Sequence, residues 1–128
     1  MMVIDVSAAV AIIQKEPGYE SVADRMVADE LRFMSPVSAV ETAMALARRY
    51  AEPSSVVDAY FHTAHIQIKD IDAAQAEWAR KAFLLFGKGR HPARLNLGDC
   101  FSYAAAKALN APLLFVGEDF SKTDILIA

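Results

Sequence analysis

The chain has 128 residues, of which 55% are hydrophobic, and a formal net charge of −3. This length corresponds to one domain that can bury its own core, and the apolar content excludes an intrinsically disordered chain. The single cysteine, Cys100, excludes an internal disulfide. No apolar run approaches the length of a membrane span, about 20 residues. We therefore expect a cytoplasmic protein without a membrane partner.

Short apolar segments alternate with helical patterns along the whole chain. In chain order, the expected elements are a strand at 2–5, helices at 8–14 and 20–29, a strand at 31–35, helices at 36–49 and 53–65, a strand at 66–69, a helix at 73–86, a loop at 87–98, a helix at 99–109, and strands at 112–116 and 125–127. Ser7, Ser35 and Asp72 are the expected caps of three of these helices. The inner face of the second helix should carry Val22, Met26 and Val27.

Such alternation is typical of a parallel sheet covered by helices on both faces. We therefore predict a three-layer α/β/α domain with a mostly parallel sheet of four to five strands. Asp5 and Asp119 follow strands at the carboxyl edge, where such sheets bind ligands. Glu41 and Asp99 lie near the starts of helices that begin at the same edge. The four acids should converge and, because like charges repel, should bind Mg²⁺ or Mn²⁺.

Asp5 and Glu41 are the clearest of the four candidates. Asp5 could cap the first helix, but Ser7 is available for that role and leaves Asp5 free. Glu41 lies three residues before Met44, which places a carboxylate on the apolar stripe of its helix. A core-facing carboxylate is unfavourable unless it is paired or binds a metal. The alternative is that Glu41 lies at the margin of the stripe and reaches solvent.

The other two acids have ordinary explanations when each is considered alone. Asp99 lies in the first turn of its helix, where the helix dipole favours any acid by about 0.3–1 kcal/mol. Asp119 lies in a loop, where exposed acids are common, and Asp124 competes with it for the same role. We place Asp119 first among the ligands. Behind the ligands we expect Ser7, Ser38 and Asp124.

A basic segment lies close to these acids in the sequence. The chain has no acid between Glu77 and Asp99, and the candidates for binding a polyanion in this stretch are Lys88, Arg90, His91 and Arg94. The ordinary alternative is a solvated loop and helix face.

Three segments resemble a known family. They are MVIDVSAAVAI, SAVETAMALARR and GKGRHPARLNLGDCFSYAAAKALNAPLLFVGEDFSKTDI, and the resemblance spans essentially the whole chain. The order of strand–Asp, Ser-x-x-Glu on a helix, Gly-Asp opening an Ala-rich helix and Asp-Phe after a strand resembles the PIN domain. More narrowly, it is similar to the VapC-type toxins of type II toxin–antitoxin systems.

The resemblance implies a set of metal-binding acids. It maps them onto Asp5, Glu41, Asp99 and Asp119. Asp5 and Asp99 match the usual ligand pair and are the first choice. Many PIN domains also have a Thr or Ser and then an Asp shortly before the Phe, where this chain has Phe115 and Gly117. Only Asp119 is left for the fourth position.

The resemblance also implies an activity and partners. It implies an endoribonuclease, a hydrolase of phosphodiester bonds, that cleaves RNA with water activated by Mg²⁺ or Mn²⁺. It further implies a homodimer, inhibition by a VapB-like antitoxin, and a heterotetramer or larger assembly with that antitoxin. The expected docking surface is the helical face near residues 22–27 and 56–61. The alternative is a catalytically weak PIN-like module that binds RNA or protein.

Overall fold

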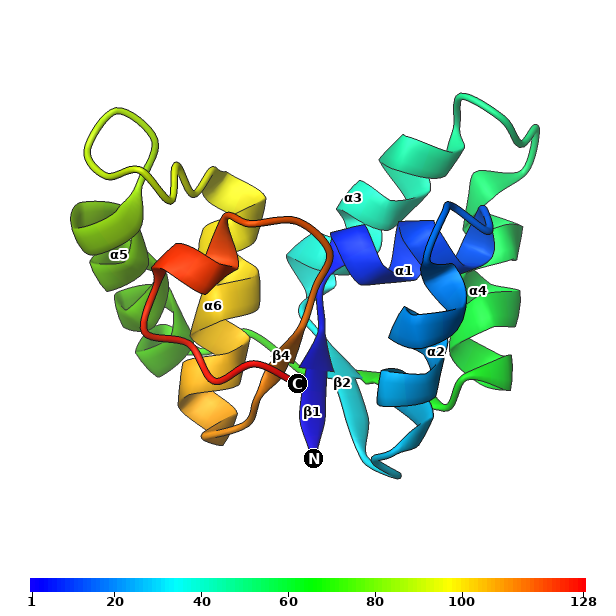
Figure 1. Cartoon of the computed structure of the whole chain (residues 1–128), viewed down its shortest axis with the longest axis horizontal. Helices are drawn as coiled ribbons and strands as arrows, with labels where there is room; N and C mark the ends of the chain where they lie inside the picture. The colour runs from blue at the N-terminus through cyan, green and yellow to red at the C-terminus, as the bar shows by residue number, and fades with distance from the viewer.

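Four short parallel strands form the central sheet, in the order β3-β2-β1-β4. Figure 1 shows β1 between β2 and β4. The computed structural model describes all residues, 1–128. Its elements are β1 (Met2–Ile4), α1 (Val6–Ile13), α2 (Tyr19–Val27), β2 (Arg32–Met34), α3 (Pro36–Leu46), α4 (Pro53–Thr63), β3 (Ile66–Ile68), α5 (Ala73–Phe86), α6 (Leu97–Leu109), β4 (Leu113–Leu114) and the 3₁₀ turn η1 (Phe120–Lys122). The predicted alternation of strands and helices is confirmed. The segment predicted as a fifth strand makes only one isolated bridge, between Ile127 and Leu113.

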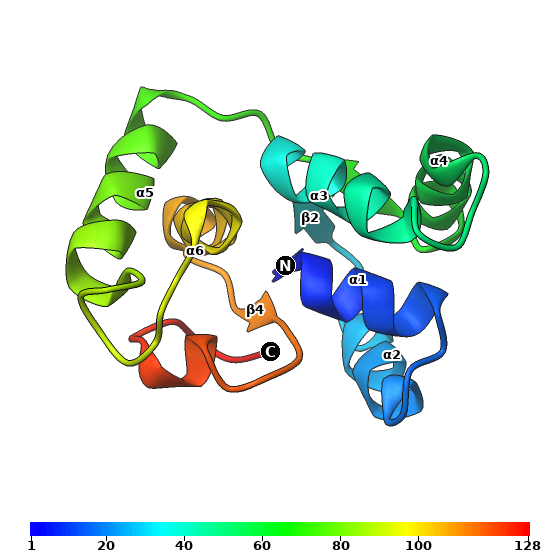
Figure 2. The same cartoon turned by 90° about the horizontal axis from the view of Figure 1, so that it is seen from above.

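Side chains of β1 alternate between two cores, which makes the domain three-layered (Figure 2). Val3 packs in the core beneath α5 and α6, whereas Met2 and Ile4 pack in the core beneath α1 and α2. The sheet is therefore buried on both faces, as its continuous apolar strands predict. Helix α3 packs against α1, α4 and α6. No helix is both long and apolar enough to cross a membrane.

The predicted helix starts are confirmed at α3 and α5 but not at α1, nor at α6, which begins at Leu97 and not at Asp99. Ser35 and Asp72 cap α3 and α5, as predicted. The prediction that Ser7 caps the first helix is wrong, because Asp5 is the N-cap and its carboxylate accepts a hydrogen bond from the Ser7 backbone N–H. The extended backbone of β1 continues through Asp5, and this is the conformation that an N-cap requires. The residue directly after the strand therefore takes the capping role.

Fewer residues of α2 are buried than the sequence predicts. Val22 and Met26 are buried against the second core, but Val27 is 60% exposed. The two buried residues are one turn apart, and Val27 lies about 100° further around the helix, on the solvent side.

Candidate functional site

Asp5 lies at the carboxyl end of β1 and is almost completely buried, with 4% of its surface exposed. Its Oδ2 accepts hydrogen bonds from the Ser7 backbone N–H at 3.0 Å and from the Ser7 hydroxyl at 2.6 Å. Its Oδ1 accepts a hydrogen bond from the Ser102 hydroxyl of α6 at 2.6 Å. The Ser7 hydroxyl in turn accepts a hydrogen bond from the Val116 N–H beyond β4. These three donors hold a buried carboxylate in one orientation.

A second buried serine extends this network toward α3. The Ser38 and Ser102 hydroxyl oxygens are 3.0 Å apart, and both residues are fully buried. A hydroxyl carries one hydrogen, and that of Ser102 is donated to Asp5, so Ser38 is the donor in this pair. Sequence analysis placed Ser38 behind the ligands. In the structure its hydroxyl is connected to Asp5 through the Ser102 hydroxyl.

Glu41 reaches the site from α3 across the surface of α6. Its carboxylate lies directly over Gly98, where a Cβ atom would be only 1.5 Å from Oε1. Burial, followed by the negative charge of Asp5, raises the pKa of Glu41. The prediction that Glu41 lies on a core-facing stripe is wrong, because Met44 on the same side of α3 is 67% exposed. The buried side of α3 is instead formed by Ser38, Thr42 and Leu46.

Among the four acids, Asp99 has the most strongly shifted pKa. It is the third residue of α6 and forms a capping box with Asn96, in which each side chain accepts a hydrogen bond from the other residue's backbone N–H. Burial, together with the charges of Asp5, Asp119 and Glu41, raises the pKa of Asp99 to about 6, against the Asn96 backbone hydrogen bond, which lowers it. All three other acids therefore act on this carboxyl group.

Asp119 is exposed and lies at the start of η1, with no capping hydrogen bond from its side chain. It lines a small polar pocket of about 220 Å³ together with Asp99, Asn96, Lys88 and Arg94. The structure thus places two of the predicted RNA-binding residues beside two of the predicted metal ligands.

The other two predicted RNA-binding residues make contacts with the end of α5. The Arg90 side chain donates a hydrogen bond to the Leu84 carbonyl, and its guanidinium lies over the Phe83 ring. His91 packs edge-on against Phe86, and its Nδ1 accepts a hydrogen bond from a backbone N–H two residues later. Both side chains therefore fold the loop after α5 back onto that helix.

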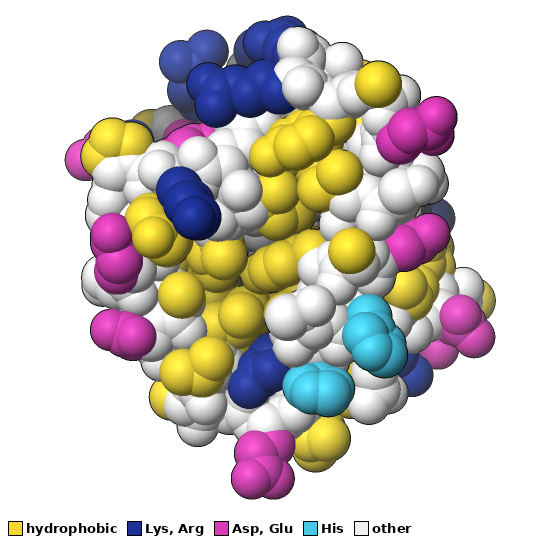
Figure 3. Space-filling view, turned by 90° about the vertical axis from the view of Figure 1, so that its right-hand side faces the viewer, with side chains coloured by type: hydrophobic (Ala, Val, Ile, Leu, Met, Phe, Trp, Pro, Cys, Tyr) yellow, Lys and Arg dark blue, Asp and Glu magenta, His cyan; other side chains and the backbone are white.

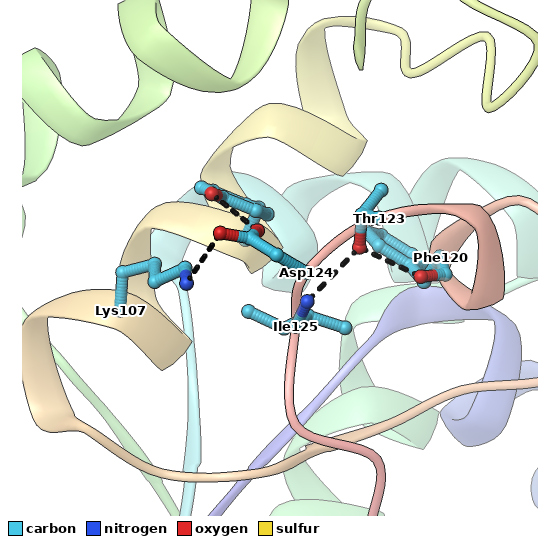
Figure 4. A network of polar contacts seen from close by, with 6 residues as sticks. Lys107, Phe120, Thr123, Asp124 and Ile125 are labelled. Carbon is cyan, nitrogen blue, oxygen red and sulfur yellow. Dashed lines mark hydrogen bonds and ion pairs between the residues drawn. The ribbon is translucent and has the colours of Figure 1, made fainter. Parts of the chain in front are cut away.

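Asp124 makes its contacts with α6 and not with the acids (Figure 4). Its carboxylate accepts hydrogen bonds from the Tyr103 hydroxyl at 2.8 Å and from the Lys107 ammonium at 3.0 Å. Thr123 stabilises the same turn, because its hydroxyl donates to the Phe120 carbonyl. The structure gives Asp124 no hydrogen bond to Asp119 or Asp99, and its role behind the ligands stays a prediction.

The four acids suit a hard divalent cation by their chemistry. They offer only oxygen donors, and burial together with the charges of the other three acids raises the pKa of Asp99. As the side chains stand, no group of three acidic, His or Cys residues is closed around one point tightly enough to hold an ion. Asp5 and Asp99 would be the principal ligands, and Glu41 and Asp119 would complete the set from opposite sides.

Two functional candidates escaped the sequence analysis. Ser102 follows Asp99 by one helical turn, and its signal is a hydroxyl within the otherwise Ala-rich α6. Gly98 was noticed only as part of the Gly-Asp motif. Its role depends on a contact with Glu41, 57 residues earlier, which no local pattern indicates.

Comparisons with known proteins identify the family of the chain. The PIN domain family model matches residues 2–126. The VapC ribonuclease Mb0640 of Mycobacterium bovis is 47% identical over 125 residues, which cover 97% of this chain and 95% of that protein.

Two solved structures share the fold. The crystal structure of Mycobacterium tuberculosis VapC20, a sarcin-ricin loop cleaving toxin, has a TM-score of 0.74 at 17% identity and covers 100% of this chain and 98% of its own. The structure of Rickettsia felis VapBC2 bound to a DNA fragment from its promoter has a TM-score of 0.73 at 18% identity and covers 98% and 95%. The chain belongs to the PIN domain family and, within it, to the VapC ribonucleases.

Proposed function

We propose that this protein is the toxin of a toxin–antitoxin pair and that it hydrolyses RNA with Mg²⁺ or Mn²⁺ at Asp5, Glu41, Asp99 and Asp119. The observation that carries the proposal is the grouping of the acids: Asp99 and Asp119 line one pocket, and the Glu41 carboxylate lies over Gly98, the neighbour of Asp99. The pKa of Asp99, raised by burial and by the charges of the other three acids, agrees with this grouping. The 47% identical relative named as a VapC ribonuclease supports the reaction class.

The residues of the chain have separate tasks in this proposal. The serines around Asp5 fix its carboxylate, and Gly98 leaves room for the Glu41 carboxylate. Lys88 and Arg94 line the same pocket as Asp99 and Asp119 and would contact phosphates there. A bound Mg²⁺ or Mn²⁺ supplies a Lewis acid for the phosphate and lowers the pKa of water.

The test uses purified protein, free of antitoxin, with defined RNAs. We expect cleavage with Mn²⁺ or Mg²⁺, none in EDTA, and a loss of more than about 100-fold in Asp5→Asn, beyond the usual effect of changing a residue behind a ligand. Asp58→Asn on α4 is the matched control, since Asp58 is exposed and outside the site. Undiminished cleavage by Asp5→Asn or in EDTA would refute the metal site. Binding of RNA without any cleavage would favour a non-catalytic module.

We propose a VapB-like antitoxin as the protein partner. The face between α2 and α4 carries a continuous band of hydrophobic side chains (Figure 3). Tyr60 and Phe61 of α4 are only partly buried there, although the Tyr60 hydroxyl contacts the Met26 sulfur of α2. An amphipathic helix of the antitoxin would bury this face. Co-expression with the antitoxin should yield one stable complex and suppress RNA cleavage.

We also propose that the toxin forms a homodimer. An apolar hollow of about 900 Å³ lies between α5 and α6, and Phe83, Leu84 and Leu97 on its walls are exposed. Light scattering of the purified protein should give twice the mass of the chain, and Leu84→Glu should give the monomer.

A further inference from the structure

A groove between α1 and α3 lies on the side of the acids opposite to the Lys88–Arg94 pocket. Its volume is about 600 Å³, and its lining includes Val6, Val10, Glu41, Met44, Arg48 and Arg49. Glu41 belongs both to this groove and to the acid cluster. The groove is therefore continuous with the candidate site.

The two arginines of this groove are exposed cations without acidic partners. Arg48 and Arg49 follow the last turn of α3. The ion pairs of the chain are Met1 with Asp29, Lys81 with Glu77, and Lys107 with Asp124, so neither arginine takes part in one. In Figure 3, Lys and Arg side chains gather at this end of the molecule. The groove thus has an apolar floor and a free positive rim.

The opposite side of the acid cluster also carries cations without acidic partners. Lys88 and Arg94 line the pocket that contains Asp99 and Asp119, and neither forms an ion pair. In Figure 1 the loop before α6 and the C-terminal end of α3 project from the same end of the molecule, on opposite sides of the carboxyl edge of β1. Unpaired cations therefore flank the acid cluster on both sides.

We propose that the α1–α3 groove is a second RNA subsite, in which Arg48 and Arg49 bind phosphates of the strand on one side of the cleaved bond. Lys88 and Arg94 bind the strand on the other side, and Val6, Val10 and Met44 form an apolar surface beneath a base. The inference rests on the proposed ribonuclease function. Single-stranded RNA is the occupant that the charges favour, since it offers regularly spaced phosphates and exposed apolar base faces.

The first experiment measures RNA affinity without cleavage. The probe is a fluorescent single-stranded RNA of about 12 nucleotides, within the usual range of single-strand sites, in EDTA. Arg48→Ala/Arg49→Ala should reduce the slope of log affinity against log salt by about 1.4, because each phosphate contact on a single strand contributes about 0.7. The control, Arg80→Ala/Lys81→Ala, removes the same charge from α5 and should leave the slope unchanged. Equal effects of the two double variants would overturn the inference.

The second experiment locates the RNA directly by thiol protection. Cys100 is the only cysteine and is 3% exposed, so a cysteine introduced at Ala45 in the groove can be labelled selectively. The probe RNA should slow labelling of Ala45→Cys but not of Ala59→Cys on α4. Equal labelling rates with and without RNA at both positions would overturn the inference. Protection of Ala45→Cys by the antitoxin but not by RNA would overturn it as well.

These outcomes separate the subsite from the proposed function. If the wild-type protein cleaves the RNA but the groove variants behave like their controls, only the subsite is wrong. If the wild-type protein neither binds nor cleaves RNA, the ribonuclease function is wrong and the subsite is wrong with it.

Discussion

Gly98 shows how one missing side chain can determine the position of a functional group. Glycine inside a helix usually lowers stability by about 0.5–1 kcal/mol relative to alanine, and nothing in the α6 backbone requires glycine at this position. The contact that requires it is the Glu41 carboxylate, which occupies the space of the absent Cβ. The functional demand on Gly98 is thus separable from its effect on folding.

Gly98→Ala should therefore weaken Mn²⁺ binding and RNA cleavage while leaving stability unchanged or raised by up to about 1 kcal/mol. The added methyl group displaces the end of a flexible side chain and not the backbone. Shortening that side chain should restore space, so Gly98→Ala/Glu41→Asp should bind Mn²⁺ more tightly than Gly98→Ala alone. Calorimetric Mn²⁺ titration and chemical unfolding check both parts. A large loss of stability in Gly98→Ala would contradict this account.

Asp99 makes stability depend on pH. Its pKa is raised from 3.8 to about 6 in the folded protein, so ionising it is less favourable in the folded than in the unfolded state. This contribution to stability is complete below about pH 4 and is lost as the pH rises through 6. In EDTA, Asp99→Asn should remove that loss, which thermal unfolding from pH 4 to 7 would reveal. Parallel pH profiles of the wild type and Asp99→Asn would argue against a raised pKa.

At the scale of elements, the sequence predicted most helices and strands but not every contact between them. Turn residues located the starts of α5 and α3, because Asp72, Ser35 and Pro36 are strong local start signals, but α3 ends at Leu46 and not at the predicted residue 49. The Asp5 cap was missed because Ser7 offers the same local chemistry. Glu41 was assigned to the wrong face, because the buried side of α3 is lined by serine and threonine that hydrogen-bond within the core. Such pairings are long-range and leave no mark on periodicity.

We expect Asp124 to stabilise the packing of the C-terminal segment against α6. Asp124→Ala would leave the hydroxyl of the buried Tyr103 without its acceptor, at a cost of about 1–3 kcal/mol. Mn²⁺ affinity should remain unchanged, since Asp124 makes no hydrogen bond to the four acids. Urea unfolding and Mn²⁺ titration measure the two effects separately. A loss of Mn²⁺ affinity with unchanged stability would instead place Asp124 behind the ligands.

At the scale of the whole molecule, the net charge conceals a polarised surface. The net charge of −3 argues against a polyanion as substrate, but unpaired cations lie on both sides of the acids. Long-range attraction of RNA should therefore be weak, whereas local contacts with phosphates should be strong. Composition alone does not distinguish this surface from a uniformly acidic one.

RNA binding should accordingly show a moderate salt dependence. If Lys88, Arg94, Arg48 and Arg49 each contact one phosphate, the slope of log affinity against log salt should be about −3 for single-stranded RNA in EDTA. Fluorescence anisotropy over a range of KCl concentrations measures it. A slope near zero would show that phosphate contacts contribute little.

The three hydrogen bonds to Asp5 limit what this residue can offer to a cation. A carboxylate has about four lone-pair directions, two on each oxygen. Both directions on Oδ2 are used by Ser7, and one on Oδ1 is used by Ser102. One lone-pair direction on Oδ1 remains free, so Asp5 can form only one coordination bond to a cation and cannot act as a bidentate ligand. The remaining coordination positions would fall to the other acids and to water, and such a partly hydrated shell favours Mg²⁺ over the larger Ca²⁺.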